Sequence, residues 1–451
     1  MNVAVIGTGY VGLTTGVALA HLGHQVTCVD TDEAKLEALR SGRIPIFEPF
    51  LESVLTLSRA QLCFTSSYAD AIPQADVVFI AVGTPSLADG NSDMRFVRAA
   101  AQSVGEHLGD AFTVIVNKST VPIGSGNWVE SLVRESLEAR GVAADFAIAS
   151  NPEFLREGSA LHDSFFPDRI VVGSDSERAI GVLEGLYGAI VVQSFRPPAG
   201  LPRPPNQNPV PFVRADLASA ELVKYAANAF LALKISFINE MAELGERVGA
   251  NVQTVARGIG LDARIGERFL QAGIGWGGSC FGKDTAALIA TAHEYGLSMP
   301  IVAAAREVNA QARARVIERL LAELKILKGR TIGLMGLAFK PNTDDLRDAP
   351  ALEIARRLIE RGARVRVHDP VALGRLKLEH SGLGVIPVDD VLALAQDADA
   401  LVLVTEWPEY LELSWEDVIA VMRNRLVLDG RNVLDQTRLE AAGARVIGVG
   451  R

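Results

Sequence analysis

The stretch Val3-Ala-Val-Ile-Gly-Thr-Gly-Tyr-Val-Gly12, near the start of the chain, decides the fold prediction. Its apolar, mostly β-branched beginning is typical of a strand buried on both faces. The glycines Gly7, Gly9 and Gly12 follow in the spacing G-x-G-x-x-G, and a helical run starts at Val11. Gly7 permits a tight turn, Gly9 lets the backbone approach a pyrophosphate, and Gly12 allows close packing of helix on strand. The stretch therefore predicts a dinucleotide site at a helix N-terminus.

A second strand-like run, from Gln25 to Val29, ends at Asp30. A carboxylate here accepts hydrogen bonds from the adenosine ribose hydroxyls and repels a 2′-phosphate, so we expect NAD as the cofactor. The alternative is a plain glycine turn with a solvent-facing Asp, which the strand, helix, strand order disfavours. Thr84 and Thr120 stand in loops that follow later strands, and we expect these loops to wall the same site.

Strands and helices alternate along the first half of the chain, which is typical of a parallel, doubly wound sheet. The Pro-rich stretch 196–211 interrupts the alternation and is predicted to be a loop or linker. Residues 216–249 form one long, largely apolar helix, and the strand, glycine, helix pattern returns at 328–340 without the full fingerprint. The predicted fold is α/β, with two Rossmann-like doubly wound domains joined by a long-helix central domain. The predicted boundaries are 1–212, 213–312 and 313–451.

Length, net charge and the distribution of apolar residues disfavour several classes of protein. The chain has 451 residues, which is enough for two or three domains at roughly 150 residues each. A net charge of −10 argues against general nucleic-acid binding or attraction to an anionic membrane. The sequence shows no signal peptide and no apolar run long enough to cross a bilayer, so we expect a reduced, cytoplasmic protein. The scattered histidines show no metal-ligand spacing, and no metal is expected.

The three cysteines differ in setting. Cys28 and Cys63 lie in strand-like runs and are expected to be small buried hydrophobes. Cys280 lies in the glycine-rich segment 273–284, beside Lys283 and Asp284, which favours a nucleophilic thiol. The alternative is an inert thiol in a binding loop.

Two polar segments remain ambiguous from spacing alone. Lys224 and Asn228 share one face of the long helix, and Lys224 either enters a pocket to stabilise an oxyanion or pairs with Glu221 on the surface. Asn151-Pro-Glu-Phe-Leu-Arg-Glu157 follows a strand and reads as a helix start with acidic residues in its first turn.

Five motifs together carry a resemblance. They are Gly7-Thr-Gly-Tyr-Val-Gly12, Asn151-Pro-Glu-Phe-Leu-Arg-Glu157, Ser219-Ala-Glu-Leu-Val-Lys-Tyr-Ala-Ala-Asn-Ala-Phe230, Gly275-Trp-Gly-Gly-Ser-Cys-Phe-Gly-Lys-Asp284 and Gly336-Leu-Ala-Phe-Lys340. In this order the chain resembles the UDP-glucose/GDP-mannose dehydrogenase family over essentially its whole length. Gly282 stands where Pro is common and Phe50 where Gly is frequent, and stretch 196–211 looks like an insertion.

The resemblance implies an NAD-dependent four-electron oxidation of UDP-glucose to UDP-glucuronate, through a thiohemiacetal and a thioester on Cys280. The same chemistry on GDP-mannose or a UDP-N-acetylhexosamine is an alternative, although Gly278-Ser279 before the cysteine disfavours the UDP-N-acetylmannosamine branch. Two other classes remain open. One is an ordinary two-electron dehydrogenase with a structural Cys280, and the other is a non-catalytic sensor of NAD or a nucleotide sugar.

The resemblance also assigns residues. Lys224 and Asn228 would stabilise an oxyanion, Asp284 with a water would handle protons, Thr120 would position that water, and Glu153 would be the general base for thioester hydrolysis. Besides the glycines, the implied NAD contacts are Val11, Asp30, Lys35, Thr84, Thr120, Glu157, Lys283 and Arg347. The implied UDP-sugar contacts are Glu153, Phe154, Leu155, Lys224, Asn228, Arg264, Phe269, Gly273, Gly277, Lys340 and Arg431. The family's central domain implies a homodimer or a larger homo-oligomer.

Overall fold

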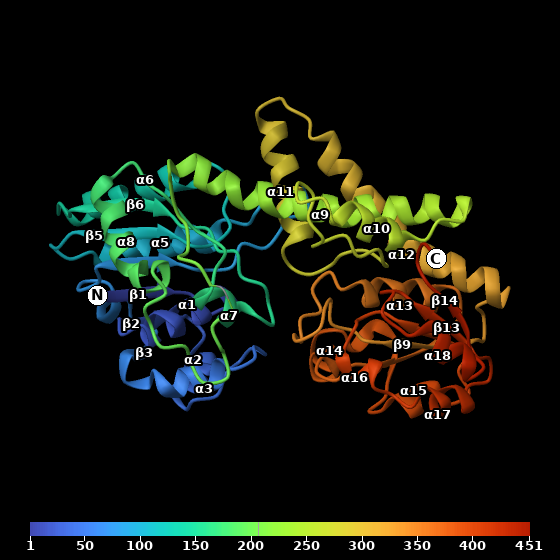
Figure 1. The fold of residues 1–451 in the computed structure, drawn as a ribbon. Helices are drawn as coiled ribbons and strands as arrows, with labels where there is room; N and C mark the ends of the chain where they lie inside the picture. The colour runs from blue at the N-terminus through green and yellow to red at the C-terminus, as the bar shows by residue number, and fades with distance from the viewer. Residues whose placement is uncertain (206) are drawn as a thin grey trace. The chain divides into compact units, whose positions relative to one another are not determined.

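The computed structural model describes residues 1–205 and 207–451. The chain forms two compact units. Unit 1 comprises residues 1–227 and 286–296, and unit 2 comprises residues 228–285 and 297–451. Figure 1 shows unit 1 mainly in blue and green, and unit 2 mainly in yellow, orange and red.

Unit 1 is built on an eight-stranded sheet with the order β3-β2-β1-β4-β5-β6-β7-β8. Its strands are β1 (Asn2–Ile6), β2 (Gln25–Val29), β3 (Leu62–Thr65), β4 (Val77–Ile80), β5 (Thr113–Asn117), β6 (Phe146–Ser150), β7 (Ile170–Gly173) and β8 (Phe212–Ala215). The strand β1 pairs in parallel with both β2 and β4. The chain adds β2 and β3 on one side of β1 and then returns to place β4 on its other side. The topological switch point, where open α/β sheets bind ligands, therefore lies between β1 and β4.

The helices of unit 1 cover both faces of this sheet. They are α1 (Tyr10–His21), α2 (Glu33–Arg40), α3 (Leu51–Leu57), α4 (Tyr68–Ala71), α5 (Arg95–His107), α6 (Ser125–Arg140), α7 (Ala160–Phe165) and α8 (Glu177–Val191), with a 3-10 turn at Arg59–Gln61. Val3 and Val5 of β1 face the core under α1, α3, α7 and α8. Ala4 and Ile6 face a second core under α5 and α6. The alternate residues of one strand thus serve two cores, and the doubly wound prediction is confirmed.

Two helices have residues in both units. One is α9 (Leu217–Val248), which confirms the predicted long helix, and the other is α11 (Phe281–Glu294). Along α9 the side chains of Leu222, Phe230, Phe237 and Leu244 are exposed in the single chain. None of the helices in the described ranges is both long and apolar enough to span a bilayer.

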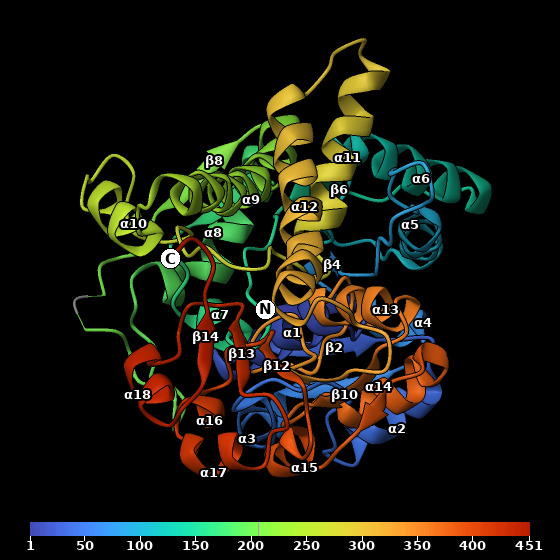
Figure 2. The same ribbon diagram turned by 90° about the vertical axis from the view of Figure 1, so that its right-hand side faces the viewer.

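Unit 2 contains a six-stranded sheet with the order β11-β10-β9-β12-β13-β14. Its strands are β9 (Thr331–Met335), β10 (Arg364–His368), β11 (Ile386–Pro387), β12 (Ala400–Leu403), β13 (Leu426–Asp429) and β14 (Arg445–Ile447), and every pairing is parallel. The other helices are α10 (Val252–Gly260), α12 (Pro300–Leu324), α13 (Pro350–Glu360), α14 (Leu373–Glu379), α15 (Val391–Ala395), α16 (Pro408–Leu411), α17 (Trp415–Ala420) and α18 (Gln436–Ala441), with a 3-10 turn at Ser381–Leu383. Figure 2 shows the strands β12, β13 and β14 side by side within unit 2.

The returning glycine pattern in unit 2 makes a different loop. Gly336 adopts a φ of 95°, and the next two amides, of Leu337 and Ala338, donate to the buried Asp369 carboxylate at 2.7 and 3.0 Å. These two N–H groups are therefore satisfied within the protein.

Three sequence expectations are wrong in detail. The sheet of unit 1 is mixed, because β7 pairs with β6 in an antiparallel sense. Residues 151–156 form no helix, since Pro152 disfavours helical backbone at Asn151, and the next helix begins only at Ala160. Cys63 is exposed, because β3 is an edge strand with one face open, whereas Cys28 is buried as expected. The described part of stretch 196–211 contains no helix or strand, as expected, but residue 206 lies outside the described residues.

Candidate active site

The three fingerprint glycines of unit 1 have distinct roles. Gly7 has a φ of 97°, and a Cβ there would lie 2.7 Å from the Ala81 carbonyl oxygen. A Cβ on Gly12 would lie 1.9 Å from the Gly7 oxygen. A Cβ on Gly9 would meet no atom within 4 Å, so open space lies before the start of α1. The loop thus provides a cradle for a pyrophosphate at a helix N-terminus, and it fits a dinucleotide.

Asp30 closes this loop from the end of β2. Its Oδ2 accepts hydrogen bonds from the Thr8 amide at 2.8 Å and the Thr8 hydroxyl at 2.6 Å. The Lys35 ammonium lies 3.2 Å from the same oxygen. Burial raises the pKa of Asp30, but the bonds from Thr8 and the amide of Asp32, together with Lys35, lower it overall. Asp30 is therefore a carboxylate beside the cradle, and the structure brings it together with Lys35.

The loops that carry Thr84 and Thr120 meet at the same edge of the sheet. The Thr84 hydroxyl donates to the Thr120 carbonyl oxygen at 2.8 Å. Ser119, next to Thr120, donates to the Val82 carbonyl oxygen at 2.7 Å. The Thr84 loop follows β4, the strand next to β1, so it adjoins the glycine loop. The Thr120 loop follows β5, the strand beyond β4, and contacts the Thr84 loop. Val11 lies in the first turn of α1, and Glu157 lies in the loop before α7.

A buried ion pair joins Glu153 to Lys224 on α9. The Lys224 Nζ lies 2.9 Å from the Glu153 Oε1, and the two side chains are only 5% and 8% exposed. Burial raises the pKa of Glu153, but Lys224, the amide of Leu155 and Lys118 outweigh it and lower that pKa. Glu221 does not hold Lys224: it accepts hydrogen bonds from the amides of Gly124 and Gly126 at the start of α6. The surface-pair alternative for Lys224 is therefore excluded.

Lys118 is a residue whose importance the sequence did not reveal. Its buried ammonium donates to the Asn151 side-chain oxygen at 2.9 Å, and the Tyr187 hydroxyl donates to the same oxygen at 2.6 Å. Burial lowers the pKa of Lys118 to about 8, with Glu153 acting against that shift and Lys224 adding to it. Two ammonium groups thus act on one buried carboxylate. The only sequence signal was a Lys directly after an apolar strand.

In unit 2 the Cys280 thiol is half-buried at the start of α11. In the loop before it, the two glycines Gly277 and Gly278 are packed too closely to carry a side chain. A Cβ on Gly277 would lie 2.4 Å from the Asp348 carbonyl oxygen, and one on Gly278 would lie 2.7 Å from the Phe339 ring. Trp276 and Phe281 meet edge to face at 5.9 Å between ring centroids. The segment is therefore a rigid support for one accessible thiol.

Asp284 lies one helical turn beyond Cys280, and its amide donates to the Cys280 carbonyl oxygen. Its carboxylate is almost completely buried, and it accepts a hydrogen bond of 2.5 Å from the Asn228 side-chain amide. The Lys283 ammonium lies 2.8 Å from its other oxygen. The structure thus brings Asn228, Lys283 and Asp284 together. Such an arrangement orients a carboxylate for proton transfer.

The structure brings only some of the predicted sugar-nucleotide contacts of unit 2 close to the Cys280 loop. Arg431 donates to the Gly275 carbonyl oxygen at 3.0 Å, so it braces the cysteine loop. A Cβ on Gly273 would lie 2.7 Å from the Gly430 oxygen, beside Arg431. In contrast, the Arg264 side chain is 88% exposed and pairs with Asp262.

The remaining predicted contacts have local partners. Arg347 pairs with Asp345, and the Lys340 ammonium lies 5.3 Å from the Phe339 ring centroid. Phe269 has a φ of 66° and meets the Phe281 ring. In unit 1, the Arg169 guanidinium lies 3.6 Å from the centroid of the Phe154 ring. The Leu155 amide donates a hydrogen bond to the Glu153 carboxylate.

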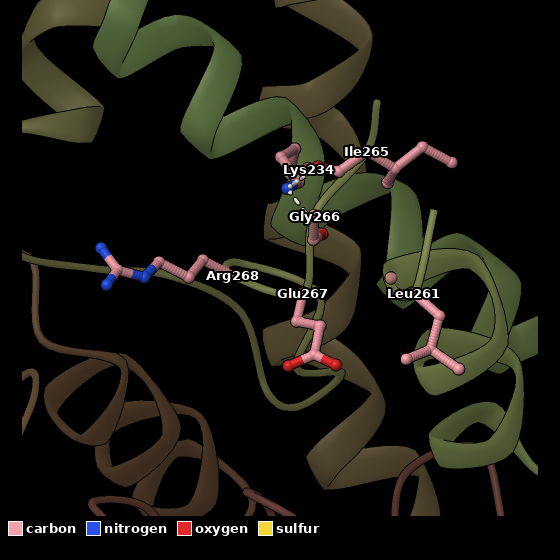
Figure 3. Close-up of a pocket in the computed structure, with 7 residues that line it drawn as sticks. Lys234, Leu261, Ile265, Gly266, Glu267 and Arg268 are labelled. Carbon is pink, nitrogen blue, oxygen red and sulfur yellow. Dashed lines mark hydrogen bonds between the residues drawn. The ribbon is translucent and has the colours of Figure 1, made fainter. Parts of the chain in front are cut away.

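A cavity of about 500 Å³ lies beside the loop that precedes Phe269. Figure 3 shows its lining, in which the Lys234 ammonium donates to the backbone oxygens of Ile265 and Gly266. Figure 3 also shows Glu267 and Arg268 pointing in different directions. Lys234 therefore ties this loop to α9. Across residues 1–205 and 207–451, no group of three or more His, Cys, Asp or Glu side chains is arranged to hold a metal ion.

Comparisons with known proteins cover the entire chain. Residues 1–191 match the NAD binding domain of the UDP-glucose/GDP-mannose dehydrogenase family, residues 218–311 its central domain and residues 333–436 its UDP binding domain. The chain is 44% identical to UDP-glucose 6-dehydrogenase TuaD of Bacillus subtilis (strain 168), covering 100% of this chain and 93% of that protein. It is 44% identical to UDP-glucose 6-dehydrogenase of Rhizobium meliloti (strain 1021), with full coverage of both.

A solved structure is similar throughout. It is a UDP-glucose dehydrogenase from the hyperthermophilic archaeon Pyrobaculum islandicum, with a TM-score of 0.88 and 41% identity over 100% of this chain and 97% of that one. The NAD cradle of unit 1 and the cysteine loop of unit 2 thus occur in a chain that is similar to these enzymes from end to end. The chain therefore belongs to the UDP-glucose/GDP-mannose dehydrogenase family and has its NAD binding domain.

Proposed function

We propose that this protein oxidises UDP-glucose to UDP-glucuronate with two equivalents of NAD. The observation that carries the proposal is the half-buried Cys280 in its closely packed loop, followed by the buried Asp284 that Asn228 and Lys283 hold. A dehydrogenase that removes only one hydride forms no thioester, so its reaction does not require a nucleophilic thiol. The names of relatives at 41–44% identity over the whole chain support UDP-glucose as the sugar nucleotide.

In the first oxidation, Asp284 receives the proton of the C6 hydroxyl through a water molecule that Thr120 helps to position. The glycine loop, Asp30 and Lys35 would hold NAD, which would supply the hydride acceptor for each of the two oxidations at C6. The Lys224 ammonium and the Asn228 amide lie at positions i and i+4 of α9, so they share one helix face. Both donate to the oxygen on C6 as negative charge develops there.

The second stage depends on Cys280. Its thiolate attacks the C6 aldehyde, and a C–S bond forms as the carbonyl oxygen becomes an oxyanion. Loss of the second hydride leaves a thioester. Glu153 then takes a proton from the attacking water, the C–S bond breaks, and the thiolate returns to Cys280. The sum is UDP-glucose, two NAD⁺ and water giving UDP-glucuronate, two NADH and three protons.

The other predicted contacts complete the proposal. Val11, Thr84, Glu157, Lys283 and Arg347 contact NAD. Phe154, Leu155, Arg264, Phe269, Gly273, Gly277, Lys340 and Arg431 surround the sugar nucleotide. The domains span 1–212, 213–312 and 313–451, and they work in the cytoplasm as a homodimer or a larger homo-oligomer. The exposed apolar side chains of α9, among them Phe230 and Leu244, support a subunit contact through this helix.

The test is a panel of sugar nucleotides with NADH counted per sugar consumed. UDP-glucose should be the best substrate and should yield two NADH. A preference for GDP-mannose or a UDP-N-acetylhexosamine would overturn the proposed substrate. One NADH per sugar would identify a two-electron dehydrogenase, and binding of both ligands without turnover would identify a sensor. The mass of the protein in solution, measured by light scattering, tests the homodimer.

A further inference from the structure

The buried carboxylate of Glu48, which has no role in the proposed catalysis, connects the glycine loop of unit 1 to the turn before α7. Glu48 lies in the loop before α3, and it is only 8% exposed. Its Oε2 accepts hydrogen bonds from the Tyr10 hydroxyl and, at 2.7 Å, from the Gly158 amide. Its Oε1 accepts the Leu161 amide at 3.1 Å. One side chain thus joins the glycine loop to the turn that starts α7.

Two of the three partners of Glu48, Tyr10 and Gly158, adjoin residues expected to contact NAD. Tyr10 follows Gly9 directly and is the first residue of α1. Gly158 follows Glu157 and has a φ of 79°, and its amide also donates to the Tyr10 hydroxyl. The same segment carries Glu153 five residues earlier. We propose that Glu48 is a positioning residue, which locks Tyr10 of the glycine loop to the Gly158–Leu161 turn and thereby sets the affinity of unit 1 for NAD.

The position demands a carboxylate. Three donors converge on its two oxygens, whereas a glutamine offers one acceptor oxygen and turns an NH₂ group towards the others. The other titratable or charged groups that face Glu48 are Tyr10 from α1 and Asp163 from α7, and Asp163 is itself held by Arg156. Burial raises the pKa of Glu48 to about 7, against the bonds from backbone amides.

The ionisation of Glu48 gives this lock a pH dependence. As the pH falls through about 7 the carboxyl takes up a proton, so the hydrogen bonds from Tyr10 and Gly158 lose the negative charge that strengthens them. NAD affinity should therefore fall as the pH is lowered from 8 to 6. The inference rests on the proposed function only in taking NAD as the ligand of unit 1, and it makes no use of Cys280 or of a sugar.

The experiment measures NAD binding by calorimetry in the absence of any sugar nucleotide. Glu48→Gln should raise the Kd for NAD about tenfold at pH 8, the factor expected for a lost hydrogen bond to a charged group. It should also abolish the change in affinity between pH 8 and pH 6. Tyr10→Phe should show a smaller effect, and the double variant should be no worse than Glu48→Gln. Glu52→Gln, an exposed carboxylate of α3, is the matched control and should bind like wild type.

Hydrogen exchange in the free protein provides a readout that does not involve NAD. The amides of Gly158 and Leu161 should exchange faster in Glu48→Gln. If that variant melts earlier but binds NAD with wild-type affinity and pH dependence, Glu48 is merely structural and the inference is overturned. If Glu48→Gln fails to fold, an unchanged affinity in Tyr10→Phe overturns it equally. A wild type that binds NAD but does not oxidise UDP-glucose would contradict the proposed function and leave this test intact.

Discussion

The Lys224 ammonium and the Glu153 carboxylate form an ion pair of 2.9 Å inside unit 1, with both side chains almost fully buried. The ammonium lowers the pKa of Glu153 and so keeps this carboxylate ionised. One pair thus joins the cation proposed for the oxyanion to the base proposed for hydrolysis, and it holds that base in the charge state that it needs. Lys118 adds a second cation to the same carboxylate.

Replacing Lys224 by Met should lower kcat by about 100-fold or more, with little change in the Kd for NAD. Glu153 would lose its ion-pair partner and keep only the Leu155 amide and the influence of Lys118. Removing one partner of a buried ion pair typically costs about 3–5 kcal/mol of stability at neutral pH. In wild type the lowered pKa of Glu153 contributes stability above about pH 4.5, and this contribution disappears as the pH falls further. The variant should lose this acid dependence, as measured by thermal melts from pH 7 to pH 3. A greater loss of NAD affinity than of kcat would contradict the oxyanion role.

Cys280→Ser should stop the reaction after the first oxidation. A serine hydroxyl is a far weaker nucleophile than a thiolate at neutral pH, so the aldehyde is not captured. We expect no more than one NADH per sugar, and mass spectrometry should find aldehyde-level product or adduct. Undiminished formation of UDP-glucuronate by this variant would rule out the thioester route. Cys63→Ser, at an exposed thiol of unit 1, is the matched control and should behave as wild type.

Asn228→Asp should shift the pH profile of kcat. It places a second carboxylate against Asp284, in place of the amide that now donates at 2.5 Å. Two carboxylates in contact raise the pKa of one of them, so activity should fall on the acid side at a higher pH than in wild type. Asn228→Leu removes the donor without adding charge. It should reduce kcat without that shift, and identical profiles for the two variants would argue against proton handling by Asp284.

Gly9→Ala should weaken NAD binding, whereas Gly12→Ala should lower the stability of the fold. The methyl group on Gly12 would collide with the Gly7 carbonyl oxygen, so this variant should melt well below wild type. The methyl group on Gly9 meets nothing in the protein, so Gly9→Ala should melt like wild type but bind NAD at least about tenfold more weakly, because it fills the cradle. Melting curves and NAD calorimetry on the pair check this. Normal NAD binding by Gly9→Ala would place the pyrophosphate elsewhere.

Lys118→Met should change both stability and activity in a pH-dependent way. The pKa of Lys118 falls to about 8 on folding, from roughly 10.4 in an unfolded chain. The unfolded state therefore binds more protons between those values, and wild-type stability should rise from pH 8 to pH 10. The variant should lack that rise in thermal melts. With one cation fewer near Glu153, its activity should also fall at a higher pH on the acid side, and Lys118→Arg should restore the wild-type profile.

The sequence by itself determined the local features of this protein. The doubly wound sheet follows from Val3 to Ile6, because each residue of that run is apolar and two cores are needed to bury alternate sides. The cradle follows from the glycine spacing, since the close approach of Gly12 to the Gly7 carbonyl oxygen is a steric constraint between near neighbours in the chain, although Gly7 also packs against Ala81, just after β4. The long helix α9 was equally readable, because helical periodicity is local.

Only the tertiary structure decided which charges meet. Lys224 pairs with Glu153, which is 71 residues away, and leaves Glu221 to cap α6. Glu48 reaches across 110 residues to Gly158. Within residues 151–156, which form no helix, Glu153 is held by Lys224 and by the Leu155 amide. Cys63 is exposed because it lies on the open face of the edge strand β3. Long-range contacts of this kind depend on how separate elements pack, and no spacing along the chain encodes them.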